Sequence, residues 1–146
     1  MNKDFDLLQP HRRLNAHRKA SISTPSEAII SFDGEEEILF NKLIFSAFMN
    51  CFAEGGGVPM APDAKPDDGK LSVCVAYGIP KITAFFNFLK LTSGKHTNTK
   101  GFYLRDFTKA VIKCAHPATL HLDGEYGNEV QDVTVEVMPS VLTLLM

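Results

Sequence analysis

Short apolar stretches separated by turn residues run along this chain from about residue 28 to its end, and this pattern constrains the fold most strongly. The expected strands are residues 28–32, 38–40, 40–52, 71–77, 102–107, 110–115, 119–122, 133–137 and 141–145. Several are separated by turn dipeptides, which are Asp33-Gly34, His116-Pro117, Asp123-Gly124 and Gly127-Asn128. Many short strands at this spacing, with one or two helices, predict a mainly β fold, a β-sandwich of antiparallel strands.

One segment has helical periodicity instead. Its apolar residues recur at helical spacing and are Ile82, Phe85, Phe86, Leu89 and Leu91. Pro80 suits the first position of a helix, and Gly94 is typical of the residue that follows a helix. The mostly apolar segment 40–52 favours a strand buried on both faces, but its length leaves a second helix open.

Size and charge exclude several classes of protein. A chain of 146 residues is long enough for one hydrophobic core. Its net charge of -2 gives no bulk attraction to nucleic acid, so no nucleic-acid partner is expected. No apolar run reaches the length of about 18 residues that a membrane span needs, and residues 1–20 have no hydrophobic signal-peptide core. We therefore expect a cytoplasmic protein, and a peripheral place at the inner membrane face stays open.

The first 27 residues differ from the rest of the chain. Basic side chains gather there among few apolar ones, and they are His11, Arg12, Arg13, His17, Arg18 and Lys19. One interpretation is a weakly anchored arm or a linker to an upstream domain. The other is a basic patch that faces phosphates or anionic lipid headgroups. Residues 28–146 are predicted to form the β-sandwich domain.

The segment 54–69 is the first candidate functional site. Gly55, Gly56 and Gly57 allow the backbone to approach a ligand closely, and their N–H groups could bind a phosphate or a headgroup. A flexible loop would have the same composition. Residues 66–69, Pro-Asp-Asp-Gly, fit a type I turn. The same turn could hold a hard cation such as Mg²⁺ through one carboxylate and loop carbonyls.

An Asp-Gly-Glu tripeptide at residues 123–125 is the second candidate. A carboxylate at a strand end can act as a general base toward a hydroxyl, an effect worth about 10²–10⁴ in rate. However, Asp-Gly is also an ordinary hairpin turn, and the chain repeats the tripeptide at residues 33–35, where the pattern predicts a plain exposed hairpin. The tripeptide alone therefore does not assign a catalytic role to Glu125.

Taken in order, these motifs carry a resemblance that none of them carries alone. They are Gly55-Gly56-Gly57, Ala61-Pro62-Asp63-Ala64, Asp67-Asp68-Gly69 and Asp123-Gly124-Glu125. Their order and spacing resemble the C-terminal domain of the bacterial diacylglycerol kinase and related lipid kinases, in the NAD-kinase-like superfamily. The resemblance covers residues 28–146 and includes Ser93-Gly94-Lys95-His96 after the predicted helix.

The resemblance implies an activity and roles for particular residues. In that family the N-terminal domain binds ATP through Gly-Gly-Asp-Gly-Thr, and the C-terminal sandwich helps to bind the lipid. The γ-phosphoryl of ATP passes to a lipid hydroxyl such as that of diacylglycerol, with Mg²⁺ as cofactor. Glu125 would match the proton acceptor, whereas Gly55, Gly56, Gly57 and Asp123 would lie in the substrate cleft. Asp68 would match the side-chain ligand of a Mg²⁺ site, with the backbone carbonyls of Lys65 and Lys70 as its other protein ligands.

The chain also departs from the family. It contains no Gly-Gly-Asp-Gly-Thr, so we expect little or no activity from it alone. The expected partners are the missing ATP-binding domain, from the same parent chain or a separate one, and a lipid substrate at a membrane surface. An exposed apolar segment at Phe85, Phe86 and Phe88 would favour a homodimer. The alternatives are a non-catalytic β-sandwich module that binds lipids or proteins, and a related enzyme with a non-lipid substrate.

Overall fold

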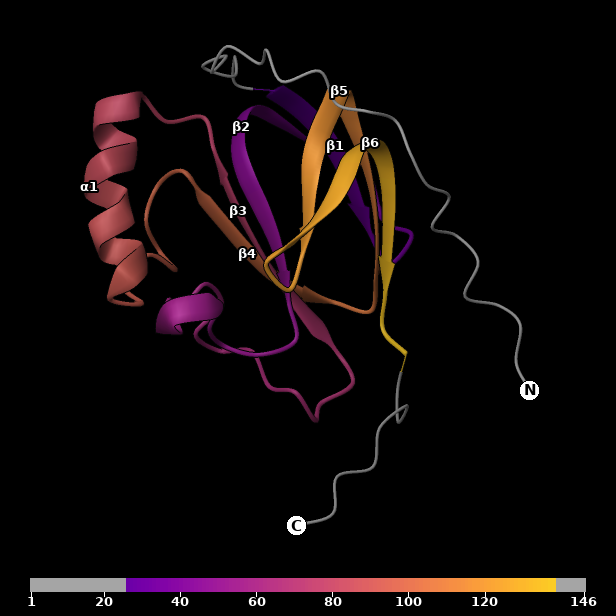
Figure 1. The fold of residues 1–146 in the computed structure, drawn as a ribbon, viewed down its shortest axis with the longest axis horizontal. Coiled ribbons are helices and arrows are strands. Elements are labelled where there is room, and N and C mark those ends of the chain that lie inside the picture. The colour runs from indigo at the N-terminus through magenta and orange to yellow at the C-terminus, as the bar shows by residue number, and fades with distance from the viewer. Residues whose placement is uncertain (1–25, 139–146) are drawn as a thin grey trace.

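Six antiparallel strands and one α-helix make up the fold in a computed structural model, which describes residues 26–138 (Figure 1). The strands are β1 (Ser26–Phe32), β2 (Ile38–Met49), β3 (Leu71–Tyr77), β4 (Phe102–Phe107), β5 (Lys109–Leu122) and β6 (Glu125–Glu136). The helix α1 is Lys81–Thr92, and a 3₁₀ turn, η1, is Gly55–Gly57. The strand order is β4-β3-β2-β1-β5-β6, which confirms the mainly β antiparallel fold. Residues 1–25 of the predicted arm 1–27 and the predicted strand 141–145 lie outside the described residues. Ser26 and Glu27, the last two residues of the predicted arm, belong to β1 instead.

Strand β2 is shared by two layers of this sheet. Its first part pairs with β1 up to Leu43, and its second part pairs with β3 from Leu43 to Met49. The register shifts at this changeover, and Lys42 has a φ of 55°. Bulges of this kind bend a strand so that it passes from one sheet layer into another. The two layers are therefore β4-β3-β2 and β2-β1-β5-β6.

Aromatic rings fill the space between the layers. The ring of Phe32 on β1 lies 5.5 Å from that of Phe107 and 6.0 Å from that of Tyr103, both on β4. In a flat sheet, β1 and β4 would be three strand spacings apart, about 14 Å. These contacts exist because the sheet folds over on itself, as the sandwich prediction requires. The buried cluster between the layers consists of Ile30, Phe32, Phe40, Val73, Val75, Phe107, Ala110 and Ile112.

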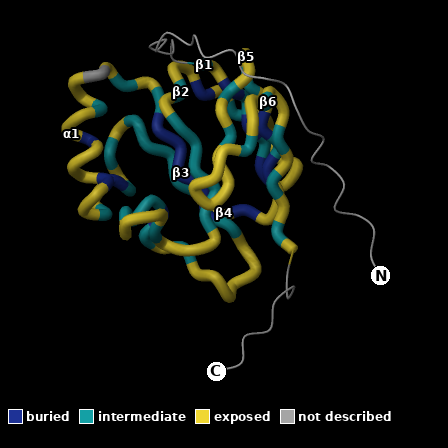
Figure 2. Tube along the Cα trace, in the orientation of Figure 1, coloured by how far each residue is buried: buried dark blue, intermediate teal, exposed yellow. Residues whose placement is uncertain are grey.

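Strand β3 is buried on both faces, which explains its continuous apolar sequence. Val73 and Val75 point into the core between the layers. Cys74 points the other way and lies 3.7 Å from His96 in the segment that follows α1. The ring of His96 also lies 4.9 Å from that of Phe102 on β4. The segment after α1 therefore covers the outside of the β3–β4 layer, and α1 lies at the edge of the molecule (Figure 2).

The strands are fewer and longer than the sequence pattern predicts. The expected break at His116-Pro117 lies within β5, and the expected turn at Gly127-Asn128 lies within β6. Register shifts in the β5–β6 pairing absorb these residues as bulges, and Asn128 has a φ of 86°. The segment 40–52 contains no helix and contributes to β2 instead.

Candidate functional site

The two Asp-Gly-Glu tripeptides form similar backbone turns in different surroundings, and Asp33 and Gly34 have φ values of 53° and 77°. Residues 123–125 close the β5–β6 hairpin tightly, because Leu122 pairs directly with Glu125. Asp123 and Gly124 have φ values of 49° and 85°, as a two-residue turn that matches the strand twist requires. Glu125 is exposed at the first position of β6, so its carboxylate is open to a partner.

The turn stands at the end of an overhanging arm. Within residues 26–138, strand β1 pairs with β5 only from Ala110 to Cys114, and beyond that point β5 and β6 pair only with each other. We call residues 115–130 the β5–β6 arm. Leu122 and Tyr126 near its tip are 61% and 56% exposed. A two-stranded hairpin is marginally stable alone, so the geometry suits an arm that reaches toward a further surface.

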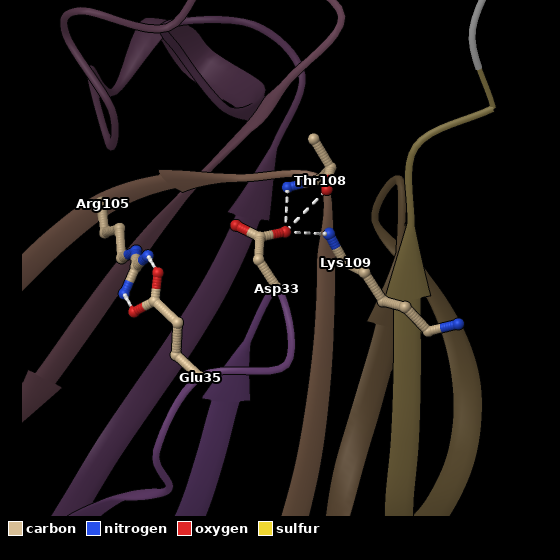
Figure 3. A network of polar contacts seen from close by, with 5 residues as sticks. All are labelled: Asp33, Glu35, Arg105, Thr108 and Lys109. Atoms are coloured by element: carbon tan, nitrogen blue, oxygen red, sulfur yellow. Dashed lines mark hydrogen bonds and ion pairs between the residues drawn. The ribbon is translucent and has the colours of Figure 1, made fainter.

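The other tripeptide has a structural role (Figure 3). Asp33 Oδ1 accepts hydrogen bonds from Thr108 N–H at 2.8 Å, Thr108 Oγ1 at 2.6 Å and Lys109 N–H at 2.9 Å. Glu35 forms a paired salt bridge with Arg105, with N–O distances of 2.7 and 2.5 Å. The bond to Glu35 raises the pKa of Arg105, and the same pairing lowers the pKa of Glu35. These contacts join the two layers, so we call Asp33, Glu35, Arg105 and Thr108 the clasp.

The three glycines of the predicted cleft loop form the short turn η1 in the connection between β2 and β3. Glu54 and Val58 close this turn through a β-bridge, and Gly57 N–H donates to Glu54 O at 2.9 Å. Gly56 and Gly57 have φ values of 77° and 79° in open space. The backbone conformation, rather than close packing, therefore requires glycine at these two positions.

The predicted metal loop lies further along the same connection. Asp68 Oδ1 accepts a hydrogen bond from Lys70 N–H at 2.9 Å, which orders the turn. Among residues 26–138, no group of three His, Cys, Asp or Glu side chains could hold a metal ion. The predicted ligand set is of another kind, with one carboxylate and the carbonyls of Lys65 and Lys70. Such a set fits only a hard cation that keeps several of its waters, as Mg²⁺ does.

A shallow cavity of about 200 Å³ lies between this connection and the β3–β4 layer. It is lined by Ala61, Asp63, Ala64, Ser72, Leu104, Arg105 and Asp106. Ser72 Oγ donates a hydrogen bond of 2.6 Å to Asp106 in its wall. None of the predicted site residues lines this cavity, although Asp63 and Ala64 belong to a motif that carries the family resemblance.

His96 is a residue whose role the sequence pattern does not reveal. It is fully buried, and its Nε2 lies 3.0 Å from the Met60 carbonyl and 3.7 Å from Cys74 Sγ. It thereby fixes the β2–β3 connection to β3. Burial lowers the pKa of His96, which keeps the imidazole neutral so that Nε2–H donates to the carbonyl. A contact across 36 residues leaves no local sequence signal.

The predicted site residues therefore fall into two groups. Gly55, Gly56 and Gly57 share the β2–β3 connection with Asp68, at one end of the β4-β3-β2 layer. Asp123 and Glu125 lie at the tip of the β5–β6 arm, which extends from the other layer. The fold gives each group a defined place on an exposed connection or turn.

Comparison with known proteins agrees with this fold. Residues 13–146 match the family described as the YegS C-terminal NAD kinase beta sandwich-like domain, and the chain belongs to that family. A search of curated proteins found no significant match.

Solved structures of proteins from Bacillus anthracis str. Sterne, described as diacylglycerol kinases, have the same fold. One matches with a TM-score of 0.61 at 20% sequence identity, over 78% of this chain and 38% of its own. A second has a TM-score of 0.59 at 18% identity, over 82% of this chain and 39% of its own. A third has a TM-score of 0.56 at 20% identity, over 80% of this chain and 42% of its own. The chain thus spans about two fifths of the length of these structures.

Proposed function

We propose that this chain is the C-terminal half of a lipid kinase, which transfers the γ-phosphoryl of ATP to a diacylglycerol-like hydroxyl. The observation that supports this most is the position of Glu125, exposed at the tip of an arm that overhangs the sandwich. A carboxylate presented in this way can meet a substrate held by another domain. The second Asp-Gly-Glu copy, bound within the clasp, is committed to the fold and does not compete for this role.

In the proposed reaction, the Glu125 carboxylate accepts the proton of the lipid hydroxyl. The oxygen of that hydroxyl attacks the γ-phosphorus of ATP, and ADP leaves. Asp123, in the same turn, and the glycines of η1 border the cleft in which the lipid headgroup lies. Phosphoryl transfer depends mainly on positioning and charge neutralisation around the triphosphate. The ATP-binding domain and its Mg²⁺ would supply these, from the same parent chain or from a separate one.

The Asp68 loop is proposed as a second, structural Mg²⁺ site. Asp68 would give one carboxylate oxygen, and Lys65 and Lys70 would give main-chain carbonyls. The bond from Lys70 N–H to Asp68 already holds this turn in shape, so the cation would add rigidity to a preformed loop. Asp68→Asn keeps the hydrogen-bond acceptor and removes the charge, so it should weaken Mg²⁺ binding measured by calorimetry.

The test of the proposed function compares the two Asp-Gly-Glu copies. Lipid phosphorylation from labelled ATP is measured with this chain alone and with the chain joined to the ATP-binding domain of its parent enzyme. We expect activity only in the joined protein. Glu125→Gln should lower kcat about 10²–10⁴-fold without changing the melting temperature. Glu35→Gln, the matched control, should lower the melting temperature and leave kcat at the wild-type value.

Two results would count against the proposal. Wild-type kcat in Glu125→Gln would remove its role as base. Failure of any joined protein to phosphorylate a lipid, with the fold intact by circular dichroism, would favour a non-catalytic lipid- or protein-binding module instead. A simpler observation comes first: an in-frame Gly-Gly-Asp-Gly-Thr upstream of this chain in its gene would support the kinase.

A further inference from the structure

Helix α1 exposes most of its apolar residues. Ile82 is 77% exposed, Phe85 63%, Phe86 59%, Phe88 54% and Leu89 54%. Among the residues of α1 whose burial is described, only Asn87 and Leu91, one turn apart, are buried. Figure 2 shows the helix at the edge of the molecule, coloured mostly as exposed.

These exposed residues form one surface. At about 100° per residue, Ile82, Phe85, Phe86 and Leu89 project from the side of α1 opposite Asn87 and Leu91. We call these four residues and Phe88 the α1 face. Single apolar residues scattered over a surface are normal, whereas a cluster of large ones marks an interaction surface.

The segment of the sequence that carries the α1 face has charges of one sign. Every charged residue between positions 69 and 105 is basic, and these are Lys70, Lys81, Lys90, Lys95, Lys100 and Arg105. The chain as a whole carries a net charge of -2, so this segment contrasts with the rest. Lys90, Lys95 and Lys100 are exposed and form no ion pair with any residue in 26–138. They remain available to an external anionic surface.

We propose that the α1 face is a membrane-docking surface, which inserts its apolar side chains among the acyl chains of an anionic bilayer while the lysines contact headgroup phosphates. An amphipathic helix with aromatic and aliphatic residues on one side and lysines at its edges suits the interface of a membrane. Anionic headgroups add attraction for each nearby lysine. No helix within the described residues could cross a membrane, so α1 would lie along the surface.

Charge disfavours a second copy of this chain as the partner. A two-fold dimer places the same patch on both sides of the interface. Two α1 faces in contact would bring the unpaired lysines of one copy toward those of the other, with no carboxylate in the segment to compensate. The homodimer expected from the apolar segment is therefore the weaker interpretation of this surface.

The experiment measures sedimentation of the full 146-residue chain with vesicles, without ATP. Vesicles of phosphatidylcholine with about 30 mol% phosphatidylglycerol should bind the chain, pure phosphatidylcholine should bind it weakly, and salt should reduce the binding. Phe85→Ser with Phe86→Ser should lower the affinity about tenfold or more. Lys90→Glu with Lys95→Glu should remove the preference for anionic vesicles. All substituted side chains are exposed, so the fold should persist, as checked by circular dichroism.

Matched controls separate this surface from other exposed groups. Leu39→Ser removes an exposed apolar side chain of β2, which is 53% exposed, and Lys42→Glu reverses an exposed lysine on the same strand. Both should bind vesicles as the wild type does. A variant with Arg12→Gln, Arg13→Gln and Arg18→Gln tests the N-terminal basic cluster in the same assay.

Three outcomes would overturn the docking proposal. One is unchanged vesicle binding in the α1-face variants. Another is loss of binding only in the N-terminal variant. The third is a dimer in light scattering that Phe85→Ser with Phe86→Ser converts to monomer, without vesicle binding by the wild type.

This inference rests on the proposed function in one respect, which is that a lipid kinase must reach a bilayer to meet its substrate. Glu125→Gln should bind vesicles normally, so failure of docking and failure of catalysis are distinguishable.

Discussion

The carboxylate of Asp33, at the end of β1, accepts hydrogen bonds from both the N–H and the hydroxyl of Thr108, the single residue between β4 and β5. These residues are 75 positions apart in the sequence. Strand β4 is at one edge of the sheet order, and β5 lies next to β1 in the other layer. The bond therefore fixes the point at which the chain steps from one layer of the sandwich to the other.

Asp33→Ala should destabilise the protein by about 1–2 kcal/mol, after allowance for solvent exposure, because three acceptor contacts are lost. Alanine would also be strained at the φ of 53° found at this position. Urea denaturation measures the effect. Asp123→Ala is the control, since it has similar backbone strain at a φ of 49° without the clasp contacts. Equal losses in the two variants would mean that the clasp contributes nothing beyond backbone strain.

Acid should weaken the clasp. The hydrogen bond from the Thr108 hydroxyl, followed by the N–H groups of Lys109 and Thr108, holds the pKa of Asp33 below its ordinary value. Since the folded pKa is the lower one, this carboxylate adds stability above the unfolded pKa of about 3.9, and the contribution is lost as pH falls through the folded pKa. Denaturation midpoints measured from pH 6 to pH 2 should fall less steeply in Asp33→Asn. An identical slope in the variant would contradict this origin of the acid sensitivity.

His96 should make stability depend on pH in a higher range. Burial lowers its pKa, opposed by the bond to the Met60 carbonyl, and within residues 26–138 its buried Nδ1 has no hydrogen-bond partner. Between the folded pKa and the unfolded value of about 6.5, only the unfolded chain takes up the proton. Stability should therefore fall as pH drops below about 6.5 and stay level above it. His96→Asn should remove this dependence in urea titrations, whereas His121→Asn, at an exposed position of the arm, should retain it.

The cysteines should differ in reactivity. Burial raises the pKa of Cys74 to about 12, so its thiol is protonated at pH 8 and shielded from reagents. Cys51 is exposed, whereas Cys114 is half-buried, with its pKa raised first by burial and then by the charge of Asp132. Iodoacetamide should label Cys51 in the native protein and Cys74 only after unfolding, as read by peptide mass spectrometry. Equal rates at Cys51 and Cys74 would show that His96 and the segment around it do not cover Cys74.

The pattern of apolar residues along the sequence predicted β3, β4 and α1 correctly. Alternation and β-branching located β3 and β4 with the same bounds that the structure has. Helical spacing located α1, and Gly94 ends it with the bonds expected of a glycine stop, from Gly94 N–H to Leu91 O and from Lys95 N–H to Lys90 O. In each case the pattern of neighbouring residues is sufficient to indicate the element.

Long-range pairing decided the rest. The strand pairing is interrupted at His116-Pro117, as the turn prediction implies. It resumes at Ala118 with Val130, so the dipeptide lies in a bulge within β5. Likewise, the clasp and the contact of His96 with Met60 form only after distant strands meet. The site assignments came from the ordered motifs, and for Glu125, Asp68 and the η1 glycines they remain predictions. Nothing local distinguishes the two Asp-Gly-Glu tripeptides, and their different surroundings appear only in the folded chain.

Because the β5–β6 arm extends beyond its pairing with β1, insertions in β5 and β6 would change its length in steps of whole residues. Adding two residues to each strand would move Glu125 outward by about 6.6 Å and keep it on the same face. Adding one residue to each would turn the carboxylate to the opposite face. Because β1 does not pair with this part of β5, either change would leave the core between the layers intact. The distance of Glu125 from the sandwich can therefore be changed by small paired insertions that leave the rest of the fold as it is.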